Sequence, residues 1–362
     1  MTPTESPKAL ALATLHESRG ARFLPLAGWA VPAHYGDPEA EYRAATSAVA
    51  WMDASFLTLV TAAGKDHIEY LNRRLSQRTL AMEVGDGLRA TQLNADGRME
   101  ADLELFRVSD AETWLLAPPA VTGEYLQFLA DKYVFSEDAR FVDADGAWGF
   151  LALFGPRTKA ALQSLGVALP EAPRRTCAAT IAGTEVRLLD LAYLPGAIIV
   201  AYPSADGAKV VAAVDAAVSK LEGRALGFLA FDTLRVESGT AWWGIDLTEK
   251  SIPLEADLFS AIHTNKGCYP GQETIAKILN LGHPARKLVG LEIDGNDPPA
   301  AGQPLKRDGA EMGRLTSATW SPRLGRCIGL GMVRWQVREA GQTLQLEDGT
   351  SARVVALPFT GS

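Results

Sequence analysis

Short apolar segments recur at regular spacing near the end of the chain, and this pattern limits the possible folds more than any other feature. Turns rich in Gly, Pro and Asp separate five such segments: Leu288–Ile293, Glu311–Ser317, Cys327–Arg334, Thr343–Leu346 and Ala352–Leu357. Regularly spaced short strands indicate a small closed or sandwich-like β domain. We therefore expect a β domain over residues 286–362.

The preceding 285 residues mix strands and helices in hairpin order. An Asp-Gly step at Asp96-Gly97 predicts a hairpin turn between strands, and a helix is expected at 121–132. From about Trp148 a strand, a helix, a hairpin and another helix follow. This order favours an α+β fold with antiparallel sheets over a wound parallel sheet. The expected units are 1–147, 148–285 and 286–362, and residues 28–36 are predicted to form an aromatic loop.

One octapeptide carries most of the chemistry. Lys266-Gly-Cys-Tyr-Pro-Gly-Gln-Glu273 places Cys268 in a turn, just ahead of a helix predicted to run from Gln272 to about Gly282. Unpaired N–H groups at a helix start and the ammonium of Lys266 both stabilise a thiolate. Cys268 is therefore the strongest nucleophile or redox candidate. The alternative is a small apolar cysteine in a structural turn.

Composition excludes several classes of protein. The net charge of −8 argues against a binder of nucleic acid. Three scattered cysteines and five histidines without ligand spacing predict neither a disulfide framework nor a metal site. No apolar run is long enough for a membrane span. The apolar run near the N-terminus is too short, and its surroundings too acidic, for a signal peptide. We therefore expect a cytoplasmic protein. Walker, Rossmann, serine-esterase and zincin motifs are all absent from the sequence.

The octapeptide resembles the signature of YgfZ-type folate-binding proteins, a branch of the glycine-cleavage T-protein (aminomethyltransferase) superfamily. Further segments resemble superfamily landmarks in the same order: Gly28–Gly36, Leu93–Gly97, Gly155-Pro156, Leu234–Gly239, Gly244–Leu247 and Thr316–Pro322. The resemblance implies a three-lobed, cloverleaf-like chain around a central folate-binding funnel, with a C-terminal β-barrel as one lobe. Tetrahydrofolate or a derivative is the implied cofactor.

The resemblance also implies a function and a set of site residues. YgfZ-type proteins support iron–sulfur cluster assembly or repair and tRNA modification, so iron–sulfur enzymes or their assembly proteins are the implied partners, without direct contact to nucleic acid. Cys268 is the implied catalytic group. Arg235 matches the arginine that binds the glutamate tail of folate, and a guanidinium suits a carboxylate. The remaining expected folate-binding residues are Asp102, Lys266, Gln272 and Glu273.

Departures from the superfamily pattern separate its branches. Where true aminomethyltransferases carry paired aspartates, only Asp102 remains, and Pro195–Ala197 has no carboxylate where the family's glutamate holds the pterin. Loss of such an acceptor leaves pterin donors unsatisfied at a cost of roughly 1–3 kcal/mol. Two other functions stay open: a genuine aminomethyltransferase working with a lipoyl carrier, and a non-catalytic scaffold.

Structural roles are the alternatives for the other site residues. Arg235 could form a helix-surface ion pair with Glu237 or Glu249, and Asp102 could be a solvated strand residue. The alternative for Lys266, Gln272 and Glu273 is a turn followed by a helix cap. For the adjacent Trp242 and Trp243, packing is favoured over ligand stacking, because neighbouring side chains point to different sides.

Overall fold

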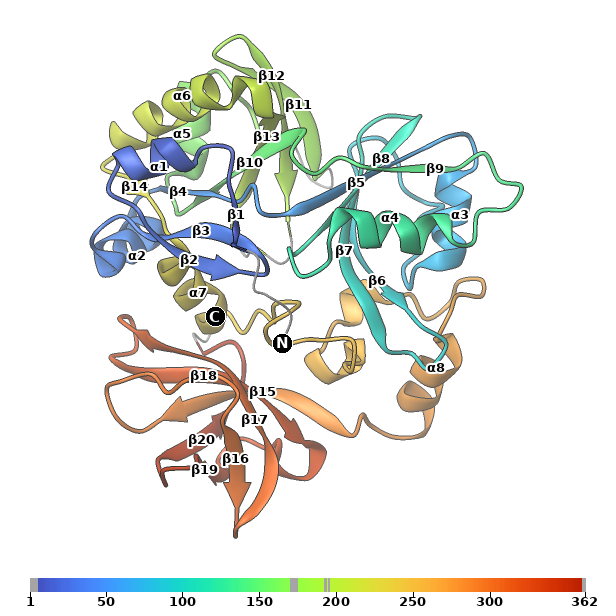
Figure 1. Cartoon of the computed structure of the whole chain (residues 1–362). Helices are drawn as coiled ribbons and strands as arrows, with labels where there is room; N and C mark the ends of the chain where they lie inside the picture. Colours follow the sequence, from blue (N-terminus) through green and yellow to red (C-terminus); the bar gives the residue numbers. More distant parts are fainter. Residues whose placement is uncertain (1–5, 170–174, 192–193, 195, 360–362) are drawn as a thin grey trace. The chain divides into compact units, whose positions relative to one another are not determined.

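The computed structural model of the chain describes residues 6–169, 175–191, 194 and 196–359 (Figure 1). Its contacts divide the chain into two compact units. The first comprises the residues up to 71, 79–89 and 103–231, and the second comprises 72–78, 90–102 and the chain from 232 onward. Each unit is assembled from separate stretches of chain. The three consecutive lobes expected at 1–147, 148–285 and 286–362 stay a prediction.

The first unit contains a six-stranded sheet backed by two helices. Its strands, in spatial order, are β11 (Thr176–Ile181), β12 (Thr184–Asp190), β13 (Ile198–Pro203), β10 (Trp148–Phe154), β4 (Ala50–Asp53) and β14 (Arg224–Ala225). All neighbours run antiparallel except β14 and β4. The apolar faces of α5 (Thr158–Ser164) and α6 (Gly207–Ser219) close the core over this sheet. This arrangement confirms the predicted α+β class.

A smaller sheet in the same unit corrects one prediction. Residues 28–36 form no loop, because Trp29–His34 is strand β3, paired antiparallel with β2 (Arg22–Leu26) and parallel with β1 (Lys8–Ala9). Pro32 lies beyond the two residues that pair with β1, and on its other side it pairs with Phe23 of β2 next to a register shift, a position where a strand tolerates proline. The remaining helices of the first unit are α1 (Ala13–Ser18), α2 (Pro38–Ser47) and α4 (Gly123–Asp131), with the 3₁₀ turn η1 (Ser204–Asp206).

A five-stranded sheet carries the predicted Asp-Gly hairpin. Its spatial order is β6 (Gly87–Leu93), β7 (Met99–Arg107), β8 (Glu112–Ala117), β5 (Thr58–Ala63) and β9 (Arg140–Asp143). The turn between β6 and β7 closes with hydrogen bonds from Asn94 N to Arg98 O and from Gly97 N to Asn94 O. Gly97 has φ +76°, a left-handed conformation that favours glycine. The hairpin prediction is therefore confirmed.

The chain ends in a closed six-stranded barrel, drawn in orange to red in Figure 1. Its order is β15 (Arg286–Ile293), β18 (Arg326–Arg334), β17 (Ala310–Ser321), β16 (Pro304–Arg307), β19 (Thr343–Gln345) and β20 (Ser351–Val355). Alternate residues such as Val289, Leu315 and Val333 fill the barrel core. The predicted β-barrel is confirmed. The sequence missed β16, because a Pro-Leu-Lys-Arg segment shows no apolar alternation.

The remaining helical segments of the chain are short. They are α3 (His67–Arg74), α7 (Phe228–Glu237), the 3₁₀ turns η2 (Pro253–Ala256) and η3 (Phe259–Ala261), and α8 (Gln272–Leu281), with η4 (Trp335–Val337) after β18. Trp242 and Trp243 are 1% and 6% exposed, so the prediction that they pack is confirmed. No helix in the described part of the chain is both long and apolar enough to cross a membrane.

Candidate functional site

Cys268 lies exposed in the turn ahead of α8, as the sequence predicts. Gly271 caps the helix at φ +78°, and Gln272 begins it. The Gln272 side-chain oxygen accepts a hydrogen bond from Tyr269 N at 3.3 Å, while Gln272 N donates to Tyr269 O at 3.3 Å. Glu273 follows, exposed in the first turn of the helix. Gln272 thus holds the turn that presents the Cys268 thiol to solvent.

Lys266 anchors this turn to the last turn of α3 and to the residues just after it. Its ammonium donates to three backbone oxygens, those of Asn72, Leu75 (2.6 Å) and Gln77 (2.9 Å). The ring of Tyr269 lies 5.0 Å from the same nitrogen. Burial lowers the pKa of Lys266 to about 8. The ammonium therefore organises the backbone around Cys268, and a folate-binding role for it stays a prediction.

Two glycines bring the β6–β7 hairpin against the octapeptide. A Cβ added at Gly271 would lie 2.6 Å from Asn94 O and 2.7 Å from the Cα of Gly97. A Cβ at Gly97 would lie 2.9 Å from the Thr274 Cβ. Two motifs about 170 residues apart in sequence therefore meet backbone to backbone, and only glycine permits that approach.

A hollow of about 400 Å³ runs along α8 beside the turn. It is lined by His263, Thr264, Lys266, Tyr269, Gln272, Glu273, Ile275, Ala276, Leu279 and Asn280. Three of the predicted site residues, Lys266, Gln272 and Glu273, thus share one cavity. Cys268 lies outside its lining.

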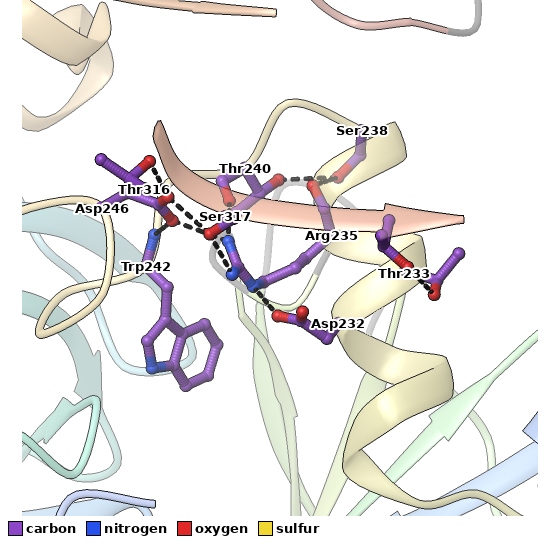
Figure 2. Close-up of polar contacts among 10 residues, drawn as sticks. Asp232, Thr233, Arg235, Ser238, Thr240, Trp242, Asp246, Thr316 and Ser317 are labelled. Carbon is purple, nitrogen blue, oxygen red and sulfur yellow. Dashed lines mark hydrogen bonds and ion pairs between the residues drawn. The ribbon is translucent and has the colours of Figure 1, made fainter. Parts of the chain in front are cut away.

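Arg235 lies in a different place, inside a buried ion-pair network. It is 1% exposed, and its Nε donates to Asp232 Oδ1 at 2.6 Å and its Nη1 to Asp246 Oδ2 at 2.7 Å. Its Nη2 donates to Ser317 Oγ at 2.7 Å. Figure 2 shows the side chain reaching from α7 toward the strand that carries Thr316 and Ser317. Burial by itself would lower the pKa of Arg235, but the charges of Asp246 and Asp232 outweigh it and raise that pKa.

Asp246 is the acceptor at the centre of this network. Besides Arg235, its carboxylate accepts from Trp242 N at 3.0 Å and from the hydroxyls of Thr316 and Ser317. The ion-pair partners of Arg235 are thus Asp232 and Asp246, and the expected pairing with Glu237 or Glu249 is wrong. Asp246, Thr316 and Ser317 lie in the landmark segments Gly244–Leu247 and Thr316–Pro322, whose sequence alone indicates no role for them. Their shared role requires three distant segments to meet.

Asp102 is fully buried in β7. The alternative of a solvated strand residue is therefore wrong, because β7 is covered on both faces over most of its length. Its folate-facing role stays a prediction, as do those of Arg235, Gln272 and Glu273. Pro195, in the segment where the pterin-holding glutamate is missing, lies outside the described residues, and Gly196 is exposed. Among the described residues, no cluster of three or more His, Cys, Asp or Glu is arranged to hold a metal ion.

Comparison with known proteins decides the family. Residues 12–266 match the GCVT N-terminal domain, and residues 286–360 match the glycine cleavage T-protein C-terminal barrel domain. The chain belongs to the glycine cleavage T-protein family. These matches bear out the superfamily that the sequence resembles, and they do not single out its YgfZ-type branch.

Relatives of this family member extend along its whole length. An aminomethyltransferase of Rubrobacter xylanophilus is 30% identical over 355 residues, covering 95% of this chain and 92% of the relative. An aminomethyltransferase of Halothermothrix orenii is 26% identical over 358 residues, covering 97% and 99%. The crystal structure of glycine cleavage system aminomethyltransferase T from Bartonella henselae superposes with a TM-score of 0.88 at 23% identity, over 98% of each chain. The last comparison establishes a shared fold.

Proposed function

We propose that this protein binds a reduced folate and transfers a one-carbon unit to or from it, as a folate-dependent aminomethyltransferase. The observation that carries this proposal is the full-length match: both domain models fit in order, and relatives along almost the whole chain are named aminomethyltransferase. Tetrahydrofolate is the cofactor or co-substrate that the family implies.

Arg235, the residue expected to bind the glutamate tail of a folate, is already engaged within the protein. All three nitrogens of the Arg235 guanidinium already donate to protein oxygens, so a folate carboxylate would have to compete with Asp232 or Asp246. Arg235 therefore supports a folate site by fixing the Asp246 loop against β17. Its direct contact with a folate tail is the less favoured role, because displacing a buried carboxylate partner is costly.

A second candidate rests on the Cys268 turn. In this reading the protein is YgfZ-like and supports iron–sulfur cluster assembly or repair and tRNA modification through Cys268. The supporting observation is that Lys266, Gln272 and Gly271 hold a turn whose cysteine is exposed. An exposed thiolate can accept a one-carbon unit, contact a cluster transiently or exchange disulfides. Asp102 as the single remaining aspartate favours the same candidate.

Two measurements on the full-length protein separate these candidates. Turnover of an aminomethyl-lipoyl carrier protein with tetrahydrofolate is expected of the aminomethyltransferase, and it should survive Cys268→Ser. If no turnover occurs while tetrahydrofolate still binds saturably, the first candidate is wrong. Absence of saturable folate binding would also remove the first candidate, and it is the result expected of a non-catalytic scaffold.

The YgfZ-like candidate is tested in cells that lack the endogenous gene. Restored activity of an iron–sulfur enzyme is expected from the wild-type protein and from Cys177→Ser, which changes a half-buried cysteine of the first unit. The Cys268→Ser variant should not restore it. Equal activity of both variants would remove Cys268 from the mechanism and with it the second candidate.

A further inference from the structure

Helix α4 and the turn after it carry four aromatic side chains that are exposed to solvent. The helix packs on the five-stranded sheet of the first unit and buries Leu126, Leu129 and Ala130 (Figure 1). The solvent face of a surface helix is normally polar, so aromatic rings there call for a physical reason. We call the four residues the aromatic patch; their exposed fractions are 43% for Tyr125, 55% for Phe128, 39% for Tyr133 and 86% for Phe135.

Contacts between its members make the aromatic patch continuous. Tyr125 and Phe128 lie three residues apart on the helix, and their rings stack with centroids 6.5 Å apart. The ammonium of Lys132 lies 5.8 Å from the centroid of the Phe128 ring and 5.3 Å from that of Tyr133. Lys132 therefore links the helix to the turn that follows it.

Phe135 extends the patch along that turn. The backbone N–H groups of Phe135 and Ser136 both donate to Glu137 Oε2 at 3.1 Å, which fixes the turn that presents the ring. At roughly 150–250 Å² of surface per aromatic side chain, the four residues leave about 450 Å² exposed. The largest apolar patch on a monomer is about 300–600 Å² and is often functional. Aromatic side chains are also the type enriched at the centre of protein interfaces.

Carboxylates surround the aromatic patch. Residues 124–138 contain four acidic side chains, those of Glu124, Asp131, Glu137 and Asp138, and a single basic one, that of Lys132. Glu124, Asp131 and Asp138 are exposed, and none of the three forms an ion pair within the described part of the chain. The rim of the aromatic patch is therefore negatively charged.

This charge decides between the possible occupants. In a symmetric dimer a second copy would bring the same carboxylates against each other, and such like-charge contacts are costly. A membrane surface that carries anionic lipids would be repelled in the same way. A protein surface with apolar residues at its centre and basic residues around them matches both the rings and the rim.

We propose that the aromatic patch docks a partner protein whose contact surface is apolar and flanked by lysine or arginine. Phe128 and Phe135 are the apolar anchors, because their rings are the most exposed and carry no polar atom. Tyr125 and Tyr133 add hydroxyl groups beside them. The aromatic patch belongs to the first unit and the octapeptide to the second, so this proposal is independent of folate binding.

The test titrates the full-length protein with two fluorescent amphipathic helical peptides of about 18 residues, five helical turns, followed by anisotropy. Both carry the same leucine face; the polar face is lysine in one and glutamate in the other. The lysine peptide should bind at least about tenfold more tightly than the glutamate peptide. Phe128→Ser/Phe135→Ser should weaken the lysine peptide at least about tenfold. The matched control Phe259→Ser, whose ring is also 55% exposed, should leave its affinity unchanged.

Two more variants separate the rings from the rim. Glu124→Gln/Asp131→Asn should weaken the lysine peptide and reduce the salt dependence of its binding, whereas the phenylalanine double variant should keep that dependence. Phe135→Ser alone changes a side chain that is 86% exposed, so it should fold normally and still lose part of the affinity.

Several results would overturn the proposal. They are no binding of the lysine peptide, equal binding of the two peptides, and unchanged affinity in the phenylalanine double variant. A wild-type dimer in sedimentation velocity that this variant dissociates would assign the aromatic patch to a second copy of the chain. Binding to phosphatidylserine vesicles that this variant abolishes would assign it to a membrane surface.

Discussion

Replacing Arg235 by methionine should destabilise the protein strongly, because its guanidinium forms ion pairs with two carboxylates, those of Asp232 and Asp246. Methionine keeps most of the side-chain volume, so the change removes charge and donors with little cavity. Asp246 is itself buried, and Asp232 retains only 23% exposure of its side chain. Both carboxylates would lose their cationic partner in a largely buried setting.

The magnitude follows from the cost of an uncompensated buried charge. Breaking a buried ion pair by removing one partner costs about 3–5 kcal/mol. For a cooperative unit of roughly 150–250 residues, each kcal/mol lowers the melting temperature by about 2–4 °C. We expect a loss of about 4 kcal/mol and a melting temperature lower by roughly 8–16 °C.

Urea unfolding measures the loss, with Arg43→Met as the control. Arg43 is also a helical arginine paired with a carboxylate, Glu39, but the two side chains are 58% and 62% exposed. Its loss should cost no more than about 0.5 kcal/mol. Adding Asp246→Asn to Arg235→Met should cost less than the sum of the single changes by about 2 kcal/mol. If Arg235→Met and Arg43→Met lowered the free energy of unfolding equally, the argument that burial makes the Arg235 ion pairs costly to break would be refuted.

The stability deficit of Arg235→Met should shrink, rather than grow, as the pH falls. Burial raises the pKa of Asp232 even with Arg235 present. A carboxyl whose folded-state pKa exceeds its unfolded value binds the proton more tightly when folded, so its contribution to stability is present at low pH and is lost as pH rises through the folded pKa. The deficit of Arg235→Met should therefore be smaller at about pH 5 than at about pH 8. A deficit that grows toward acid would contradict this.

Three further predictions concern the octapeptide. In urea unfolding, Gly271→Ala should lower the free energy of unfolding by about 1–3 kcal/mol, because it adds a Cβ at φ +78° against Asn94 O. The control Gly267→Ala, whose Cβ would meet nothing within 4 Å, should lower it by less than about 1 kcal/mol. Acetylation of Lys266, followed by mass spectrometry as a function of pH, should have its midpoint near pH 8, because burial lowers the pKa of Lys266 to about 8. Since the folded-state pKa lies below the unfolded value of 10.5, the charged ammonium lowers stability fully below about pH 8, and this penalty fades as pH rises to 10.5. A midpoint above pH 10 would contradict this. Iodoacetamide should modify exposed Cys268 in the native protein and reach Cys327 only after unfolding, because Cys327 is buried and burial raises its pKa; equal labelling rates would contradict the described burial.

Local patterns in the sequence were sufficient for several elements. The helix after Gly271, the hairpin at Asp96-Gly97 and the barrel strands follow from periodicity and turn residues acting over a few positions. Residues 28–36 and β16 were missed because strand pairing there overrides weak local preference, with Pro32 and Pro304 arguing against strands. Pairing partners far along the chain cannot be read from a local window.

For the site, sequence alone determined which residue types were present, and tertiary structure decided what each one does. The sequence placed Cys268 in a turn before a helix, and the structure leaves it exposed there. It presented Lys266 as a neighbouring charge and Arg235 as a ligand for a carboxylate. Folding instead gives Lys266 three backbone carbonyls and gives Arg235 two aspartates. The physical reason is that a buried charge takes the partners that the fold brings to it, and those partners come from distant segments of the chain.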